Sequence, residues 1–353
     1  MTDVVLHIGM GKTGTSSLQE WCGRNRPVLA EHGVLYPRTP GRFRHVRLGL
    51  MTTPLADLHK MPAWVRMNRN DPEAFQAEVR AEALAEIRSA GLPRVLFSNE
   101  GFYGSSEEAV AGVRDFLSSF ASTVRVVVYL RRQDDHLLSR YQQRIKVGAT
   151  ERLASRLDVD LTDLYDYAAR LSLWQRVVEP TELVVRPFER EQFVGGSLNQ
   201  DFLAAAGISV PADALASLPR TNESLDADAV EFLRIFNLFR VEEKGATDGQ
   251  IDNRDLVARL SARGATGPTL GLADDLLDPF LARWADANAT VARTWLGRPD
   301  GVLFTSAKRS SNVTTEQRLP LDRLPDLLEV AEVSAADRSG VRRVAEREAA
   351  SAQ

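Results

Sequence analysis

The sequence predicts an α/β protein built around a five-stranded parallel sheet. Short apolar, β-branched runs alternate with longer segments that have helical periodicity. Two of the runs, RVLFS at 94–98 and VRVVVYL at 124–130, are apolar over most of their length, which is typical of strands buried on both faces of a sheet. Strands that alternate with helices favour parallel pairing, because the chain crosses over between neighbouring strands.

The elements of this α/β part follow one another over the first 210 residues. The predicted strands share an apolar, β-branched composition and are residues 4–9, 33–37, 94–98, 124–130 and 182–188. The predicted helices share helix-forming residues and apolar positions near a 3.6-residue period, and they are residues 17–33, 73–90, 138–148 and 164–178. Gly91 is expected to end the helix 73–90, since glycine adopts the left-handed conformation of a helix C-cap.

Strand patterns fade after about residue 210. Segments 226–241 and 271–296 have the spacing of amphipathic helices. The stretch 306–318 is polar and loop-like, and the tail 320–353 is charged and Ala-rich. We therefore expect a helical C-terminal part, followed from residue 306 by a polar linker and a tail that is a peripheral helix or partly disordered.

Composition argues against several classes of protein. The net charge is −4, so no general affinity for nucleic acid is expected and any anion site must be local. The single cysteine, Cys22, precludes an intrachain disulfide, favours a reducing, cytoplasmic location and is expected to be a packed thiol. We predict no signal peptide, and no apolar stretch approaches the ~20 residues of a membrane span.

A Gly-rich loop joins the first strand to the first helix. Residues 9–17 read GMGKTGTSS, and Gly11-Lys12-Thr13 resembles the end of a Walker A motif, which also needs a glycine at position 6. Leu6 stands there, so the loop is shorter and suits a 5′-phosphate with one further group. Backbone N–H groups and the helix dipole favour an anion at such a loop. The alternative is a Gly-rich turn without a ligand.

A second anion site is predicted where the strand 124–130 ends. Arg131 and Arg132 follow it, where an NTPase would benefit from a carboxylate for Mg²⁺. Ser139 comes eight residues after Arg131, about two turns into the next helix. Ligands of open α/β sheets bind at the carboxyl edge, so Arg131 and Ser139 could reach one phosphate. Glu100, after the strand 94–98, is the one candidate carboxylate at that edge.

These residues together resemble the sulfotransferases that use 3′-phosphoadenosine-5′-phosphosulfate (PAPS). The loop of that family typically reads Pro-Lys-[Ser/Thr]-Gly-Thr-Thr, and Gly11 stands here in place of the proline. An Arg at a strand end and a Ser eight residues later bind the 3′-phosphate in the family, and Arg131 and Ser139 match them. Gln133 replaces a common proline, as in the bacterial branch. The segments LVVRPFERE, DFLAAAGI, RTNESL, NATVARTWLG and GVLF are also similar to that branch.

The resemblance covers about residues 4–305 and implies a P-loop-like, three-layer fold. It implies one sulfotransferase domain over 1–305, with a nucleotide-binding core at about 1–210 and a helical acceptor-side part at about 211–305. Residues 306–353 would lie outside this domain as linker and tail.

The same resemblance implies a reaction and the residues that serve it. The sulfuryl group of PAPS would pass in line to a hydroxyl or amine of a small molecule, glycan or lipid, and 3′-phosphoadenosine-5′-phosphate (PAP) would leave; no metal or nucleic acid is required. Lys12 would stabilise charge on the bridging oxygen. Arg220, in PRTNESL, is a further contact to the 3′-phosphate. The residues implied for the 5′-phosphate are Gly11, Lys12, Thr13, Gly14, Thr15, Ser16 and Ser17.

Two residues are candidates for the base that takes the acceptor proton. Glu100 lies at the correct sheet edge, but it could instead be a structural carboxylate paired with an arginine. His45, in GRFRHVRLGL, has a suitable pKa as a free side chain, but it could be a surface or helix-capping residue. Two other functions stay open, a P-loop small-molecule kinase or NTPase and a non-catalytic nucleotide-binding module. The sequence indicates neither the acceptor nor the oligomeric state.

Overall fold

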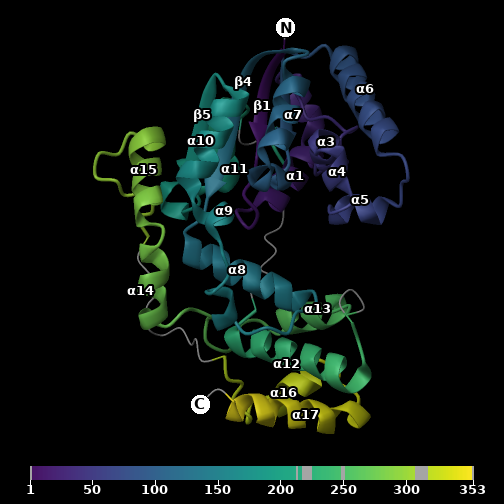
Figure 1. The fold of residues 1–353 in the computed structure, drawn as a ribbon, viewed down its shortest axis with the longest axis vertical. Helices are drawn as coiled ribbons and strands as arrows, with labels where there is room; N and C mark the ends of the chain where they lie inside the picture. Colours follow the sequence, from purple (N-terminus) through teal and green to yellow (C-terminus); the bar gives the residue numbers. More distant parts are fainter. Residues whose placement is uncertain (1, 212–213, 217–224, 248–250, 307–316, 352–353) are drawn as a thin grey trace. The chain divides into compact units, whose positions relative to one another are not determined.

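The computed structural model describes residues 2–211, 214–216, 225–247, 251–306 and 317–351. The chain divides into two compact units (Figure 1). Unit 1 comprises residues 1–132, 161–219 and 284–306, and unit 2 comprises residues 133–160, 220–283 and 307–353. Each unit is described by itself.

Unit 1 contains a five-stranded, entirely parallel sheet, which confirms the predicted fold class. Its strands are β1 (Thr2–His7), β2 (Val34–Leu35), β3 (Arg94–Ser98), β4 (Ala121–Leu130) and β5 (Glu182–Pro187), in the order β2-β3-β1-β4-β5. β4 begins three residues earlier than the apolar run predicts. Asp3 of β1 explains this extension, because its carboxylate accepts hydrogen bonds from Ser122 and Thr123 at 3.2 and 2.6 Å.

Helices cover both faces of this sheet and complete a three-layer arrangement. On one face Leu18, Trp21 and Phe202 pack against Val5 and Tyr129; they come from α1 (Thr15–Arg24) and α11 (Leu198–Ala206), with α2 (Arg26–Glu31) beside them. On the other face the ring of Phe97 packs against Phe116 of α7. The other helices of unit 1 are α3 (Val46–Thr52), α4 (Leu55–Leu58), α5 (Pro62–Met67), α6 (Pro72–Ala90), α7 (Glu107–Leu117), α9 (Thr162–Tyr165), α10 (Tyr167–Val178) and α15 (Ala285–Leu296). Short 3₁₀ helices are η1 (Glu100–Gly104), η3 (Arg190–Gln192) and η4 (Val194–Gly196).

Several predicted helices are shorter than expected, and each break has a local cause. The segment 17–33 divides at Asn25, whose side chain donates to the Trp21 carbonyl at 2.9 Å, and Pro27 favours a new helix start there. The segment 164–178 divides at Asp166, whose carboxylate caps α10 by accepting from the Ala169 N–H. Helix α6 ends at Gly91, at φ 60°, as predicted.

Unit 2 is helical in its described residues, as expected for the C-terminal part. Its elements are α8 (Gln133–Lys146), η2 (Ala154–Arg156), α12 (Ala227–Lys244), α13 (Arg254–Ala262), α14 (Asp274–Ala282), α16 (Leu324–Val330) and α17 (Ala335–Ala350). The buried Arg234 of α12 bonds to Glu231 and to Glu348 of α17 at 2.6 and 2.8 Å, so the helical part of the tail packs on α12. Most of the predicted loop 306–318 lies outside the described residues. Within those residues, no helix has the length and apolarity needed to cross a bilayer.

Candidate functional site

The topology of the sheet brings two of the predicted motifs together. The strand that follows β1 in the chain, β2, lies toward one edge of the sheet. The strand that follows β4, β5, lies toward the opposite edge. Open α/β sheets bind ligands outside the carboxyl ends of strands at such a switch point. The Gly-rich loop follows β1 and Arg131 follows β4, so both lie at the switch between these two strands.

The loop after β1 has an unusual backbone. Gly9, Lys12 and Gly14 all have positive φ, at 89, 64 and 72°. A left-handed conformation costs a lysine about 1–2 kcal/mol, and strain of this kind concentrates at ligand sites. The hydroxyls of Thr13 and Thr15 donate to the Met10 carbonyl at 2.6 and 2.9 Å, so these two threonines stabilise the loop's own fold.

The start of α1 presents the remaining polar groups of the loop. The first intrahelical bond runs from the Leu18 N–H to the Gly14 carbonyl, so the N–H groups of Thr15, Ser16 and Ser17 precede the helical ladder. Ser16 and Ser17 are exposed. Backbone donors and two exposed hydroxyls at a helix N-terminus form a suitable environment for a phosphate.

Arg131 is held directly against this loop. Its Nη1 donates to the Lys12 carbonyl at 2.9 Å, and its guanidinium lies 5.8 Å from the centroid of the Phe188 ring. Tyr167 donates its hydroxyl to the Arg131 carbonyl and fixes the backbone there. The neighbouring Arg132 is different, because it is buried and donates to the Ser306 carbonyl. Arg131 is therefore the arginine of the pair that lies at the loop.

Glu100 lies at the other side of the same loop. A Cβ placed on Gly9 would be 2.6 Å from the Glu100 Cα, so the two backbones touch. Glu100 begins η1, and the Asn99 side chain caps η1 by accepting from the Gly101 N–H at 3.0 Å. The Glu100 side chain is half-buried, and within the described ranges no hydrogen bond or ion pair reaches its carboxylate. Among the described residues, no arginine pairs with Glu100, so these residues give no support to the alternative role of a structural carboxylate.

His45 is not available as a base, which corrects one of the two assignments left open by the sequence. Its ring is buried, Nε2 donates to the Pro37 carbonyl and Nδ1 accepts from the Ser98 N–H, both at 3.0 Å. Burial lowers the pKa of His45 to about 3, so the ring is neutral. Both nitrogens are occupied, and neither can receive a proton from an acceptor. His45 also occupies the N-cap position of α3, but its side chain makes no capping bond.

The description of unit 1 does not include two of the predicted residues. Ser139 is half-buried in α8 of unit 2, whereas Arg131 belongs to unit 1, so their joint phosphate site stays a prediction. Arg220 lies outside the described residues.

The structure also reveals polar groups around the loop that the sequence did not single out. Beneath it, the buried His7 ring contacts the Ser98 hydroxyl through Nδ1 at 2.8 Å, and Gln19 donates to the same hydroxyl at 3.1 Å. Burial lowers the pKa of His7 to about 3. Beside the loop, Arg44 donates from Nη2 to the Ser16 hydroxyl at 2.8 Å. The available sequence signal was four arginines between 38 and 47 without an acidic residue.

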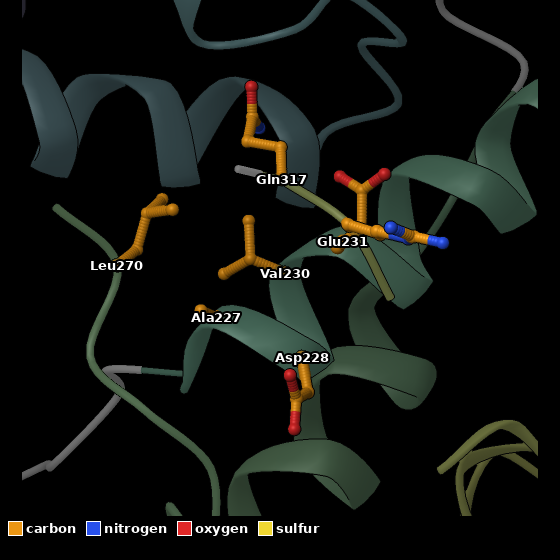
Figure 2. A pocket seen from close by; sticks show the side chains of 7 residues that line it. Ala227, Asp228, Val230, Glu231, Leu270 and Gln317 are labelled. Carbon is orange, nitrogen blue, oxygen red and sulfur yellow. The ribbon is translucent and has the colours of Figure 1, made fainter. Parts of the chain in front are cut away.

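Unit 2 contains a small cavity at α12, shown in Figure 2. Its volume is about 10 Å³, and its lining includes Asp228, Glu231, Leu270 and Gln317. The Glu231 carboxylate is already bonded to Arg234 at 2.6 and 2.9 Å. A cavity of this volume holds about one water molecule, so we do not place the functional site there.

Comparisons with known proteins assign no family to the chain. No family model and no solved structure matches it. A stretch of 117 residues, 33% of this chain, is 32% identical to an uncharacterized protein of Archaeoglobus fulgidus. The match covers 31% of that archaeal protein, so the similarity spans less than a third of the archaeal protein's length.

Proposed function

We propose that the protein is a PAPS-dependent sulfotransferase. The observation that carries the proposal is the bond between the Arg131 guanidinium and the Lys12 carbonyl, at the switch point between β1 and β4. These residues were assigned separately to the 3′- and 5′-ends of one nucleotide, and unit 1 holds them in contact. The strained backbone of Lys12 and the closeness of Glu100 to Gly9 support the same site.

Within this proposal the loop binds the donor and Lys12 acts on the leaving group. The backbone N–H groups at the start of α1 hold the 5′-phosphate, and Arg131 holds the 3′-phosphate. The acceptor oxygen or nitrogen attacks sulfur in line, and the bond from sulfur to the bridging oxygen breaks. Lys12 stabilises the negative charge that grows on this oxygen, an effect worth most in a preorganised site.

Glu100 serves as the base in this proposal. It removes the proton of the attacking hydroxyl or amine as the new bond to sulfur forms. Its position beside Gly9 places it at the edge of the sheet where the donor loop lies. The acceptor is a hydroxyl or amine of a small molecule, glycan or lipid.

Ligand binding tests the proposal against the kinase or NTPase alternative. PAP without Mg²⁺ should raise the melting temperature, and ATP with Mg²⁺ should not. PAP should also bind more tightly than adenosine 5′-phosphosulfate, which lacks the 3′-phosphate. Labelled sulfate should pass from PAPS to at least one alcohol, phenol, amine, glycan or glycolipid.

Arg131→Ala and Arg132→Gln form a matched pair for this binding test. A hydrogen bond to a charged group is worth about 1.5–3 kcal/mol, so Arg131→Ala should weaken PAP by roughly one to two orders of magnitude. It should barely change the affinity for adenosine 5′-phosphosulfate. Arg132→Gln should keep the preference, because Arg132 is bonded to the Ser306 carbonyl. Stabilisation by ATP with Mg²⁺ and not by PAP would favour the NTPase alternative.

A further inference from the structure

The segment 38–44 carries three exposed arginines: Arg38, Arg42 and Arg44. Within the part of the chain that the structure describes, none of them forms an ion pair with a carboxylate. Arg47, which follows, differs because it pairs with Glu78 and Glu82, each at 3.0 Å. The Glu86 carboxylate lies at the backbone of Arg38, from whose N–H it accepts a hydrogen bond at 2.7 Å, so Arg42 and Arg44 are the members of this group that carry the argument below.

Hydrogen bonds from Arg26 hold the backbone of this segment in place. We call Arg26, the backbone carbonyls that it binds and the turn at Gly41 the frame. The buried Arg26 donates to the Tyr36 carbonyl at 2.7 Å, to the Gly23 carbonyl at 3.0 Å and also to the Arg42 carbonyl. A Cβ on Gly41, at φ 147°, would be 2.0 Å from the Arg44 carbonyl oxygen. The backbone that carries the exposed arginines is therefore preorganised, which lowers the entropic cost of binding.

The frame lies between the donor loop and Glu100. At one end Arg44 donates to the hydroxyl of Ser16, in the first turn of α1. At the other end the His45 ring accepts from the N–H of Ser98, two residues before Glu100. The segment 38–45 is thus bonded both to the donor loop and to the strand that leads to Glu100, which are the two parts of the proposed reaction site.

We propose that Arg44, assisted by Arg42, forms an acceptor subsite for an oxyanion, a carboxylate or a sulfate ester carried by the acceptor. The planar fork of a guanidinium matches both groups. This inference rests on the proposed function, and it narrows the acceptor to acidic molecules, such as acidic sugars or hydroxylated carboxylic acids.

Matched acceptor pairs test the subsite. The probes are 4-nitrophenyl β-D-glucuronide against its uncharged methyl ester, and 4-hydroxyphenylacetate against 4-hydroxyphenylacetamide. Within each pair the principal difference is the charge of one group. Binding is measured by calorimetry in the presence of PAP, and transfer of labelled sulfate from PAPS is measured in parallel as kcat/KM.

The wild-type protein should prefer the anionic member by about tenfold, since two exposed arginines each contribute modestly. Arg44→Gln should reduce this preference to below threefold. Because Arg44 also bonds to the Ser16 hydroxyl of the donor loop, PAP affinity is measured alongside and should fall by much less than in Arg131→Ala. Arg24→Gln is the matched control, because Arg24 is an exposed arginine of α1 that pairs with Glu20 and lies two turns from Ser16. This control should keep the tenfold preference.

The two assays separate failure of the subsite from failure of the proposed function. A preference in binding that depends on Arg44, without transfer from PAPS to any acceptor of the panel, would support an anion site at Arg44 and overturn the proposed function. Transfer without a charge preference would support the function and overturn the subsite. Absence of a preference in both assays would also overturn the subsite, as would a loss of PAP affinity in Arg44→Gln as large as that in Arg131→Ala.

Discussion

The two buried histidines of unit 1 should make its stability strongly dependent on pH between 7 and 5. Burial lowers the pKa values of His7 and His45 to about 3 from an ordinary value of 6.5. Below pH 6.5 the unfolded chain binds a proton on each ring, and the folded chain does not until about pH 3. The stabilisation is therefore fully present above pH 6.5 and is lost as the pH falls toward 3.

The magnitude follows from these two values. Between pH 7 and pH 5, each histidine should remove about 2 kcal/mol from the free energy of unfolding. Both together should remove about 4 kcal/mol, a large part of the stability of an ordinary domain. Most surface carboxylates stay ionised in this window, so the histidine contribution can be measured separately from acid denaturation.

Urea denaturation at pH 7 and pH 5 measures this loss in the wild type and in two variants. His45→Gln keeps a donor for the Pro37 carbonyl, and His7→Asn keeps a polar atom for the Ser98 hydroxyl. Each variant should be less stable than the wild type at pH 7. The free energy of unfolding that it loses between pH 7 and pH 5 should, however, be about 2 kcal/mol smaller than the loss in the wild type. Equal losses in wild type and variants would refute the reasoning, because the rings would then titrate alike in both states.

Three further predictions concern the loop and the base. Gly9→Ala should lower the free energy of unfolding by roughly 2–5 kcal/mol, since its Cβ would meet the Glu100 backbone at 2.6 Å. The control Gly91→Ala, with open space around it, should lower it by only about 1–2 kcal/mol. Equal urea midpoints for the two variants would contradict the close contact. Lys12→Ala and Lys12→Gly should both lower kcat by about 10²–10³. The free energy of unfolding should be about 1 kcal/mol higher in the glycine variant than in the alanine variant, because glycine relieves the strain of the positive φ. Turnover within threefold of wild type would exclude the role proposed for Lys12. Glu100→Gln should lower kcat about 10²-fold and change stability by less than about 0.5 kcal/mol, so a large loss of stability would indicate a structural carboxylate.

The sheet was predictable from the sequence because its signals are local. A strand buried on both faces is a continuous apolar run, and all five predicted runs are strands of the observed sheet. Helix ends were less predictable, since side chains decide them: Asn25 and Asp166 interrupt segments whose apolar spacing continues past them.

The roles of site residues depended on partners far along the chain. The partners of the His45 ring are Pro37 and Ser98, eight and 53 residues away, and no local pattern shows that both nitrogens are occupied. Arg26 is similar, because its role depends on carbonyls as far away as Arg42. The closeness of the loop and Arg131 was predictable, because the carboxyl ends of neighbouring parallel strands lie at one edge of the sheet.

The frame around Arg26 separates what must be kept from what can vary. Its bonds run mostly to backbone carbonyls, from Gly23 to Arg42, and backbone groups are the same whatever side chains the segment carries. The exposed side chains at 38 and 42 can therefore be exchanged without loss of these bonds, whereas exchange of Arg44 also removes its bond to the Ser16 hydroxyl. The proposed acceptor subsite can therefore be altered by randomising these positions while Arg26, Gly41 and His45 are kept. Under the proposed function, natural divergence at the same positions would change the acceptor and leave the backbone that carries them unchanged.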